Sequence, residues 1–218
     1  EGGALQPIAE ARPIAFDRAG LYVTYDAGAE KLTLSEITVE SPSLRLAAKG
    51  HVYLPGVTRG LPDTFLAQID FDQVMVDPEG LFQEPVRFSD GALDLRLRLD
   101  PFAIDIGQLA LVEDGRRLVA QGRATAAVEG WRLALDLGLD AIAYDRLLAL
   151  WPVGIVPRTR AWLAENVLEG NLFDVKAALR LVPGKAPRLS LGYEFKDGDV
   201  RFLKTLPTIR KGSGYSTI

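Results

Sequence analysis

The sequence predicts a mainly β protein with a few short helices, arranged as one repetitive, antiparallel, twisted sheet. Three observations lead to this fold class. Apolar and polar residues alternate with a period of two along most of the 218 residues. Short turn sequences separate the alternating runs, and strand-rich segments resemble one another at a spacing of about 70 residues.

The alternating runs are the expected strands. The clearest lie at 93–99, 133–139 and 173–181, and weaker ones lie at 32–39, 44–54, 65–71, 102–106 and 189–195. Each run would present one apolar and one wet face. The alternation slips between Leu34 and Ile37 and between Phe71 and Val74, which predicts a β-bulge or a strand end at each place.

Turn chemistry joins several of these runs and favours antiparallel neighbours, because Asn, Asp and Gly accept the backbone angles that tight hairpins need. The turn sequences are Asp26-Ala-Gly-Ala, Ser89-Asp-Gly, Glu113-Asp-Gly, Glu129-Gly and Asp197-Gly-Asp.

Three short helices are expected. The first follows Asp77-Pro78 and runs to Phe82, because aspartate caps a helix and proline fits its first position. The second spans 144–150 and ends before Pro152. The third spans 157–168, beginning at a proline and ending before Gly170. Its expected apolar side consists of Ala161, Leu163, Ala164, Val167 and Leu168.

Trp162 falls on the other side of this third helix. One interpretation is that it packs under a neighbouring loop. The other is that it lies at a membrane or module interface, where tryptophan is enriched.

Similar segments recur along the chain and indicate repeated multi-strand units. Leu46-Ala-Ala-Lys-Gly50 is echoed by Leu118-Val-Ala-Gln-Gly122, and Asp77 by Asp145. We therefore expect a first β unit at 1–101, a second at 102–187 and the start of a truncated third at 188–218. The first residue is Glu1, so we expect the natural start to lie upstream.

Composition excludes several functions. A net charge of −4 without a basic stripe argues against nucleic acid. The chain has no cysteine and a single histidine, His51, so no thiolate site, catalytic triad or multi-histidine metal site is expected. The acid pairs Asp70 with Asp72 and Asp136 with Asp140 have the spacing of solvated strand faces. We expect no enzymatic activity, no cofactor and no metal.

Compactness and membrane insertion can also be judged from the sequence. A compact chain of this mass would expose roughly 9,800 Å². The longest uncharged apolar stretch, 147–156, is too short to span a membrane and contains Pro152 and Gly154.

One family resembles the second half of the chain. The segments Leu147-Leu-Ala-Leu-Trp-Pro-Val-Gly-Ile-Val-Pro157, Arg160-Ala-Trp-Leu163, Leu168-Glu-Gly-Asn171, Asp197-Gly-Asp-Val-Arg-Phe-Leu-Lys-Thr-Leu-Pro207 and Gly212-Ser-Gly214 are similar to the central region of AsmA-like proteins of the YhdP type. The similarity is best over about residues 130–218. It implies a bridge-like lipid transfer protein with a β-taco-like groove, anchored in the inner membrane by an upstream segment and projecting into the periplasm.

The resemblance implies that the sheet curls into an open groove for phospholipid acyl chains, which carries lipid between the inner and outer membranes. The expected groove residues are Leu93, Leu95, Leu97, Leu99, Leu133, Leu135, Leu137 and Leu139. Trp162, Arg201 and Lys204 are candidates for headgroup or interface contacts. The expected partners are phospholipid, adjacent repeats of the same polypeptide and proteins of the two membranes.

Two alternatives stay open at this point. The leucines would instead form a sealed core if a second layer covered them, and Arg201, Lys204, Arg210 and Lys211 would then be an ordinary solvated face. The chain would instead serve as a structural or assembly module for outer-membrane proteins if its sheet edges were the functional feature.

Overall fold

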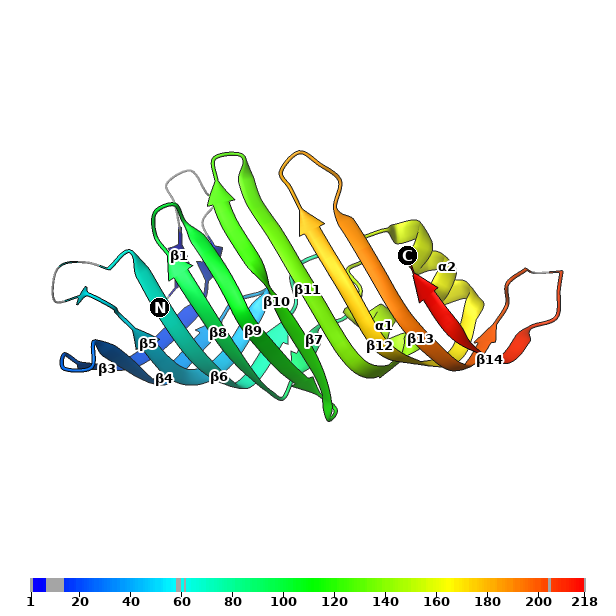
Figure 1. The fold of residues 1–218 in the computed structure, drawn as a ribbon, viewed down its shortest axis with the longest axis horizontal. Helices are drawn as coiled ribbons and strands as arrows, with labels where there is room; N and C mark the ends of the chain where they lie inside the picture. The colour runs from blue at the N-terminus through cyan, green and yellow to red at the C-terminus, as the bar shows by residue number, and fades with distance from the viewer. Residues whose placement is uncertain (1, 7–13, 58–59, 61, 204, 218) are drawn as a thin grey trace.

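The computed structural model describes residues 2–6, 14–57, 60, 62–203 and 205–217 (Figure 1). Its strands are β1 (Gly3–Leu5), β2 (Ile14–Phe16), β3 (Arg18–Asp26), β4 (Lys31–Glu40), β5 (Leu44–Tyr53), β6 (Thr64–Val76), β7 (Val86–Phe88), β8 (Asp90–Arg98), β9 (Ala103–Glu113), β10 (Arg116–Ala127), β11 (Gly130–Ala143), β12 (Val167–Leu181), β13 (Arg188–Val200) and β14 (Ile209–Thr217). Its helices are α1 (Tyr144–Leu150) and α2 (Pro157–Asn166).

Twelve strands form one antiparallel sheet, in the order β14-β13-β12-β11-β10-β9-β8-β6-β5-β4-β3, with β7 also paired to β6. The short strands β1 and β2 pair separately. The sheet does not close into a barrel, because β3 and β14 are its two edges. The expected fold class, a mainly β chain with an open, twisted, antiparallel sheet, is confirmed.

The sequence identified most strand positions correctly. Both expected bulges are present, because the register shifts between Leu34 and Ile37 in β4 and between Phe71 and Gln73 in β6. The edge strands β3 and β14 were not expected, since neither carries a sustained period-two pattern of apolar residues. Their pairing with β4 and β13 supplies the strand geometry instead.

Two of the expected turns lie within continuous extended structure. Ser89 separates β7 from β8, and both of these strands pair with the same side of β6. Asp197 lies inside β13, at a bulge where its φ is 54°. Turn-type residues therefore serve here as interruptions within strands, which a local sequence pattern does not distinguish from hairpins.

The helix expected from Pro78 to Phe82 is wrong. These residues form turns instead. The Leu81 carbonyl accepts a hydrogen bond of 2.8 Å from Val153 N, in the segment between the two helices. The other two helices are confirmed, although α2 ends at Asn166 and β12 begins at the next residue. Pairing with β13 replaces the last helical turn that the sequence predicted.

The helices and the 77–85 segment all lie at one end of the strands. The segment follows the end of β6, and α1 follows the end of β11. Arg160 of α2 reaches across to Gln83, with 3.1 Å from Nη2 to Oε1. In Figure 1 the helices lie behind and beside β12 and β13, and the blue N-terminal strands pass behind β6 and β8, so the sheet is strongly curled.

The repeat has a physical counterpart in two glycines. A Cβ added to Gly50 of β5 would lie 2.2 Å from the Gln68 carbonyl oxygen, and one added to Gly122 of β10 would lie 2.2 Å from that of Ala134. Both glycines therefore allow the same close approach of the next strand. The sheet runs without a break from β3 to β14, and the boundaries of the units stay a prediction.

Candidate functional site: an apolar sheet face

The period-two alternation places all the apolar side chains of a strand on one face of the sheet. In β8, Leu93 and Leu95 lie on this apolar face, whereas Asp94 and Arg96 lie on the opposite, polar face. Cross-strand pairing places apolar residues opposite one another: Leu95 lies opposite Ala67 of β6 and Ile106 of β9.

The register joins these side chains into continuous rows that cross the sheet. One row takes one residue from each of β3 to β6 and β8 to β13: Tyr25, Leu32, Val52, Ala67, Leu95, Ile106, Gly122, Leu135, Leu179 and Leu189. A second row crosses the same strands: Val23, Leu34, Gly50, Ile69, Leu93, Leu109, Ala120, Leu137, Ala177 and Leu191. Neither row contains a charged residue.

The structure places seven of the eight expected groove leucines in strands on this apolar face. All seven are half-buried rather than sealed: Leu93, Leu95, Leu97, Leu133, Leu135, Leu137 and Leu139. The eighth, Leu99, lies just past the end of β8 and is 41% exposed. It belongs to the loop, where its N–H donates to the Asp63 carbonyl at 3.1 Å.

Among the described residues, the helices cover the apolar face at one end of the strands. Trp151, Ile142, Leu172, Val175 and Leu191 form a buried cluster there, and residues of α1 and α2 pack on it. Trp151 Nε1 donates to the Ile155 carbonyl at 2.7 Å, which holds the turn between the helices against the sheet. A second cluster, Val74, Val86, Phe88 and Leu111, lies beside it.

The exposed area of the chain agrees with an incomplete core. The accessible surface is 13,585 Å², whereas a compact chain of this mass would expose roughly 9,800 Å². No large side chain in the described residues is more than 98% buried. The apolar face is therefore an open surface over much of its length. In the part of the chain that the structure describes, these leucines do not form a sealed core.

Trp162 lies on the outer side of α2 and is 40% exposed. Its ring meets that of Phe202 edge-on, with centroids 6.2 Å apart. Phe202 belongs to the connection between β13 and β14, so Trp162 packs against a neighbouring loop, and its role at a membrane or module interface stays a prediction. Arg201 follows the end of β13, is exposed, and its N–H donates to the Asn166 carbonyl at 2.8 Å. Lys204 lies outside the described residues.

The polar face carries several ion pairs. Asp72 pairs with Lys49 at 3.5 Å and Asp136 pairs with Arg180 at 2.5 Å, so these expected surface acids are partnered. His51 is half-buried, and its Nδ1 has no partner within the described part of the chain. Among the described residues, no three His, Cys, Asp or Glu side chains are grouped to hold a metal ion.

Several residues of the apolar face were missing from the sequence-based set, most clearly Ile104, Ile106 and Leu109 of β9 and Leu179 and Leu189 of β12 and β13. Their own alternation was visible, but the strand partners that align them with Leu95 and Leu135 are distant in sequence.

Comparison with protein-family models, with curated proteins and with solved structures finds no match to this chain. No helix in the described ranges is long and apolar enough to cross a membrane. Any function therefore has to be argued from the sheet itself.

Proposed function

We propose that this chain is a non-enzymatic lipid-binding segment of a periplasmic bridge, which moves phospholipid between the inner and outer membranes along its apolar sheet face. The observation that carries the proposal is the pair of uncharged rows that cross ten strands, in which most side chains of the first row and about half of those of the second are only partly buried. The similarity of 147–214 to AsmA-like proteins supports the bridge, its periplasmic location and its upstream anchor.

Acyl chains suit this surface for a physical reason. Each CH₂ group that leaves water for an apolar surface gains about 0.8 kcal/mol, and the contact has no preferred direction. Leu, Ile, Val and Ala side chains along the two rows offer such contacts in series without a polar anchor that would hold the lipid at one position. A lipid would therefore slide across the strands while its headgroup stays in water.

The polar face provides a matched control for a direct test. Photo-reactive residues placed at Leu95 and Leu137 should crosslink to phospholipid, whereas the same residue at Asp136, next to Leu137 on β11 but on the polar face, should not. Organic extraction of the purified chain should yield phospholipid. Equal crosslinking from the two faces, or an extract without phospholipid, would contradict the proposal.

A second candidate function has its own supporting observation. Edge strand β3 exposes apolar side chains on both faces, with Leu21 58% and Tyr22 65% exposed, and nothing in the described residues pairs with its outer side. Such an edge is a template for another strand. An assembly module for outer-membrane proteins would be captured as a protein adduct by a photo-reactive residue at Tyr22, with Leu95 giving no lipid adduct.

A further inference from the structure

Three arginines converge on one carboxylate on the polar face, opposite the rows of apolar side chains. Arg96 donates to Asp105 Oδ2 from Nε at 3.2 Å and from Nη2 at 3.1 Å. Arg98 Nη2 lies 3.3 Å from the same oxygen, and Arg123 Nε lies 3.3 Å from Oδ1. The four residues come from three adjacent strands, β8, β9 and β10, which the register places side by side.

This arginine cluster (Arg96, Arg98 and Arg123) has more positive charge than Asp105 can neutralise. Three guanidinium groups and one carboxylate leave a charge of about +2 before other neighbours are counted. Asp94, on the same face, accepts a hydrogen bond from Gln68 Nε2 at 3.4 Å and subtracts one charge, and Arg132, opposite Thr125, adds one. Arg98 Nε is buried and has no acceptor among the described residues.

The cluster is also accessible. The side chains of Arg96 and Arg123 are 54% and 50% exposed, whereas Asp105 is only 21% exposed. The carboxylate therefore lies beneath the guanidinium groups and holds them together, while their remaining N–H groups are directed elsewhere. Guanidinium groups bind phosphate oxygens through paired hydrogen bonds, so a fixed group of three is suited to an oxyanion.

A hollow of about 600 Å³ adjoins the cluster on this face. Its polar lining is Gln68, Asp94, Arg96 and Asp105. Tyr53 and Leu66 border it as well, and so do Ala67, Leu95 and Ile106 of the first apolar row. It stays open partly because Gly107 has no side chain, and an added Cβ there would meet only the Asp94 carbonyl oxygen, at 3.6 Å. The volume lies in the range of small-molecule sites.

We propose that the arginine cluster binds the phosphate group of a phosphate ester, whose organic part lies in the hollow against Tyr53 and Leu66. The phosphate is the shared chemistry of two sources, a soluble phosphate ester and a phospholipid headgroup. The arginine cluster lies on the face opposite to the proposed acyl-chain surface, and the hollow reaches the first row only at Ala67, Leu95 and Ile106.

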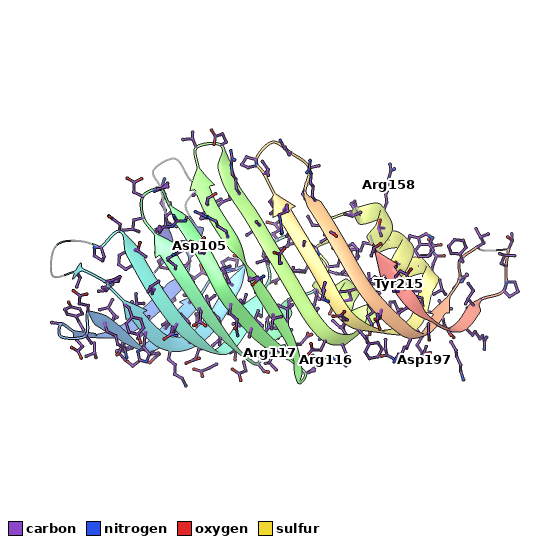
Figure 2. The ribbon with its side chains drawn as sticks, in the orientation of Figure 1. Asp105, Arg116, Arg117, Arg158, Asp197 and Tyr215 are labelled. Carbon is purple, nitrogen blue, oxygen red and sulfur yellow. The ribbon has the colours of Figure 1, made fainter. Side chains whose placement is uncertain are left out.

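Binding should be measured by titration calorimetry on the whole chain with glycerol 3-phosphate, with inorganic phosphate and with vesicles of phosphatidylglycerol. Arg96→Gln and Arg123→Gln should each weaken binding by about tenfold, because each removes a charge-assisted contact. Arg117→Gln is the matched control: Arg117 lies on the same face of β10 as Arg123, at the far end of the β9–β10 hairpin from Asp105 (Figure 2), and its loss should leave affinity unchanged.

Two further variants separate a ligand site from a merely structural ion cluster. Asp105→Asn removes the internal competing anion and should raise phosphate affinity, even where it lowers stability. Gly107→Val should fill part of the hollow. It should therefore weaken the binding of glycerol 3-phosphate and leave the binding of inorganic phosphate unchanged. Circular dichroism confirms that each variant is folded.

The outcomes are distinct. Saturable binding of glycerol 3-phosphate that depends on the cluster supports a soluble ester, and vesicle binding alone with the same dependence supports a lipid headgroup. No saturable binding of any probe up to about 10 mM, or an equal loss in Arg117→Gln, overturns the site. Crosslinking from Leu137, which does not border the hollow, should be the same in all these variants, which keeps this result separate from the test of lipid binding.

Discussion

At the scale of single residues, the sheet is most sensitive to substitution at positions where the neighbouring strand leaves no room for a side chain. Gly50 and Gly122 occupy corresponding positions in β5 and β10. A Cβ added at either position by substitution would lie 2.2 Å from a backbone oxygen of the next strand. Backbone atoms cannot rotate away as the end of a flexible side chain can, so the two strands would have to separate locally.

Gly122→Ala should therefore destabilise the sheet, by about 1–3 kcal/mol as for other overpacked sites. Urea unfolding of the variant measures the change through its midpoint. Gly154→Ala is the control, because a Cβ at Gly154 meets nothing within 4 Å. Equal midpoints for Gly122→Ala and the parent chain would show that the close approach does not constrain the sheet.

Trp151 anchors the helix end through one buried side chain. It is 4% exposed, and its Nε1 donates to Ile155 at 2.7 Å. Trp151→Phe keeps most of the apolar volume but leaves that carbonyl without its donor, and should lower the free energy of unfolding by about 1–3 kcal/mol. Thermal unfolding checks this, with Trp162→Phe as a nearby exposed control that should change little.

At the scale of elements, the two edge strands differ from the interior strands in what they expose. Strand β3 presents Leu21 and Val23 on one face and Tyr22 on the other, all substantially exposed. Nine residues of unprotected edge provide hydrogen-bonding groups in a row. Strand β14 forms the opposite edge, with Tyr215 exposed (Figure 2).

Self-association through β3 is the expected consequence in solution. Val23→Lys should shift the chain toward monomer, because lysine on an edge disfavours pairing with another strand. Sedimentation velocity over a range of protein concentrations measures this. Val119→Lys, an exposed valine on interior strand β10, should leave association as it is. If both variants associate like the parent chain, the β3 edge is not the contact.

At the scale of the whole molecule, the sheet is wide and thinly covered. Helices α1 and α2 and the 77–85 segment cover only one end of the apolar face, so the two buried clusters stay small. The rest of the apolar face relies on neighbouring strands for its burial. The large exposed area follows from this arrangement.

The radius of gyration should reflect the open shape. A compact chain of 218 residues would have a radius of gyration of about 17 Å. Small-angle X-ray scattering on the monomer should give a clearly larger value. A value close to 17 Å would indicate that the sheet closes on itself in solution, and would remove the open face on which lipid binding depends.

The limits of sequence-based inference can be traced to particular residues. The strands containing Leu93 and Leu133, and the bulge after Leu34, depend on residues adjacent in the chain, and all were predicted correctly. The helix expected after Asp77 was not formed, because Leu81 hydrogen-bonds the distant Val153. The arginine cluster was missed, since Arg96, Asp105 and Arg123 meet only through strand pairing.

The amino-acid sequence by itself determined the strand class, the division of each strand into a polar and an apolar face, and the exclusion of cysteine and multi-histidine chemistry. Side-chain alternation and turn preference are local properties, which act over a few residues. Only the tertiary structure decided which residues form each row, how much of the apolar face the helices leave uncovered, and that three arginines surround Asp105. These features depend on register between strands, and register is set by contacts between residues far apart in the chain.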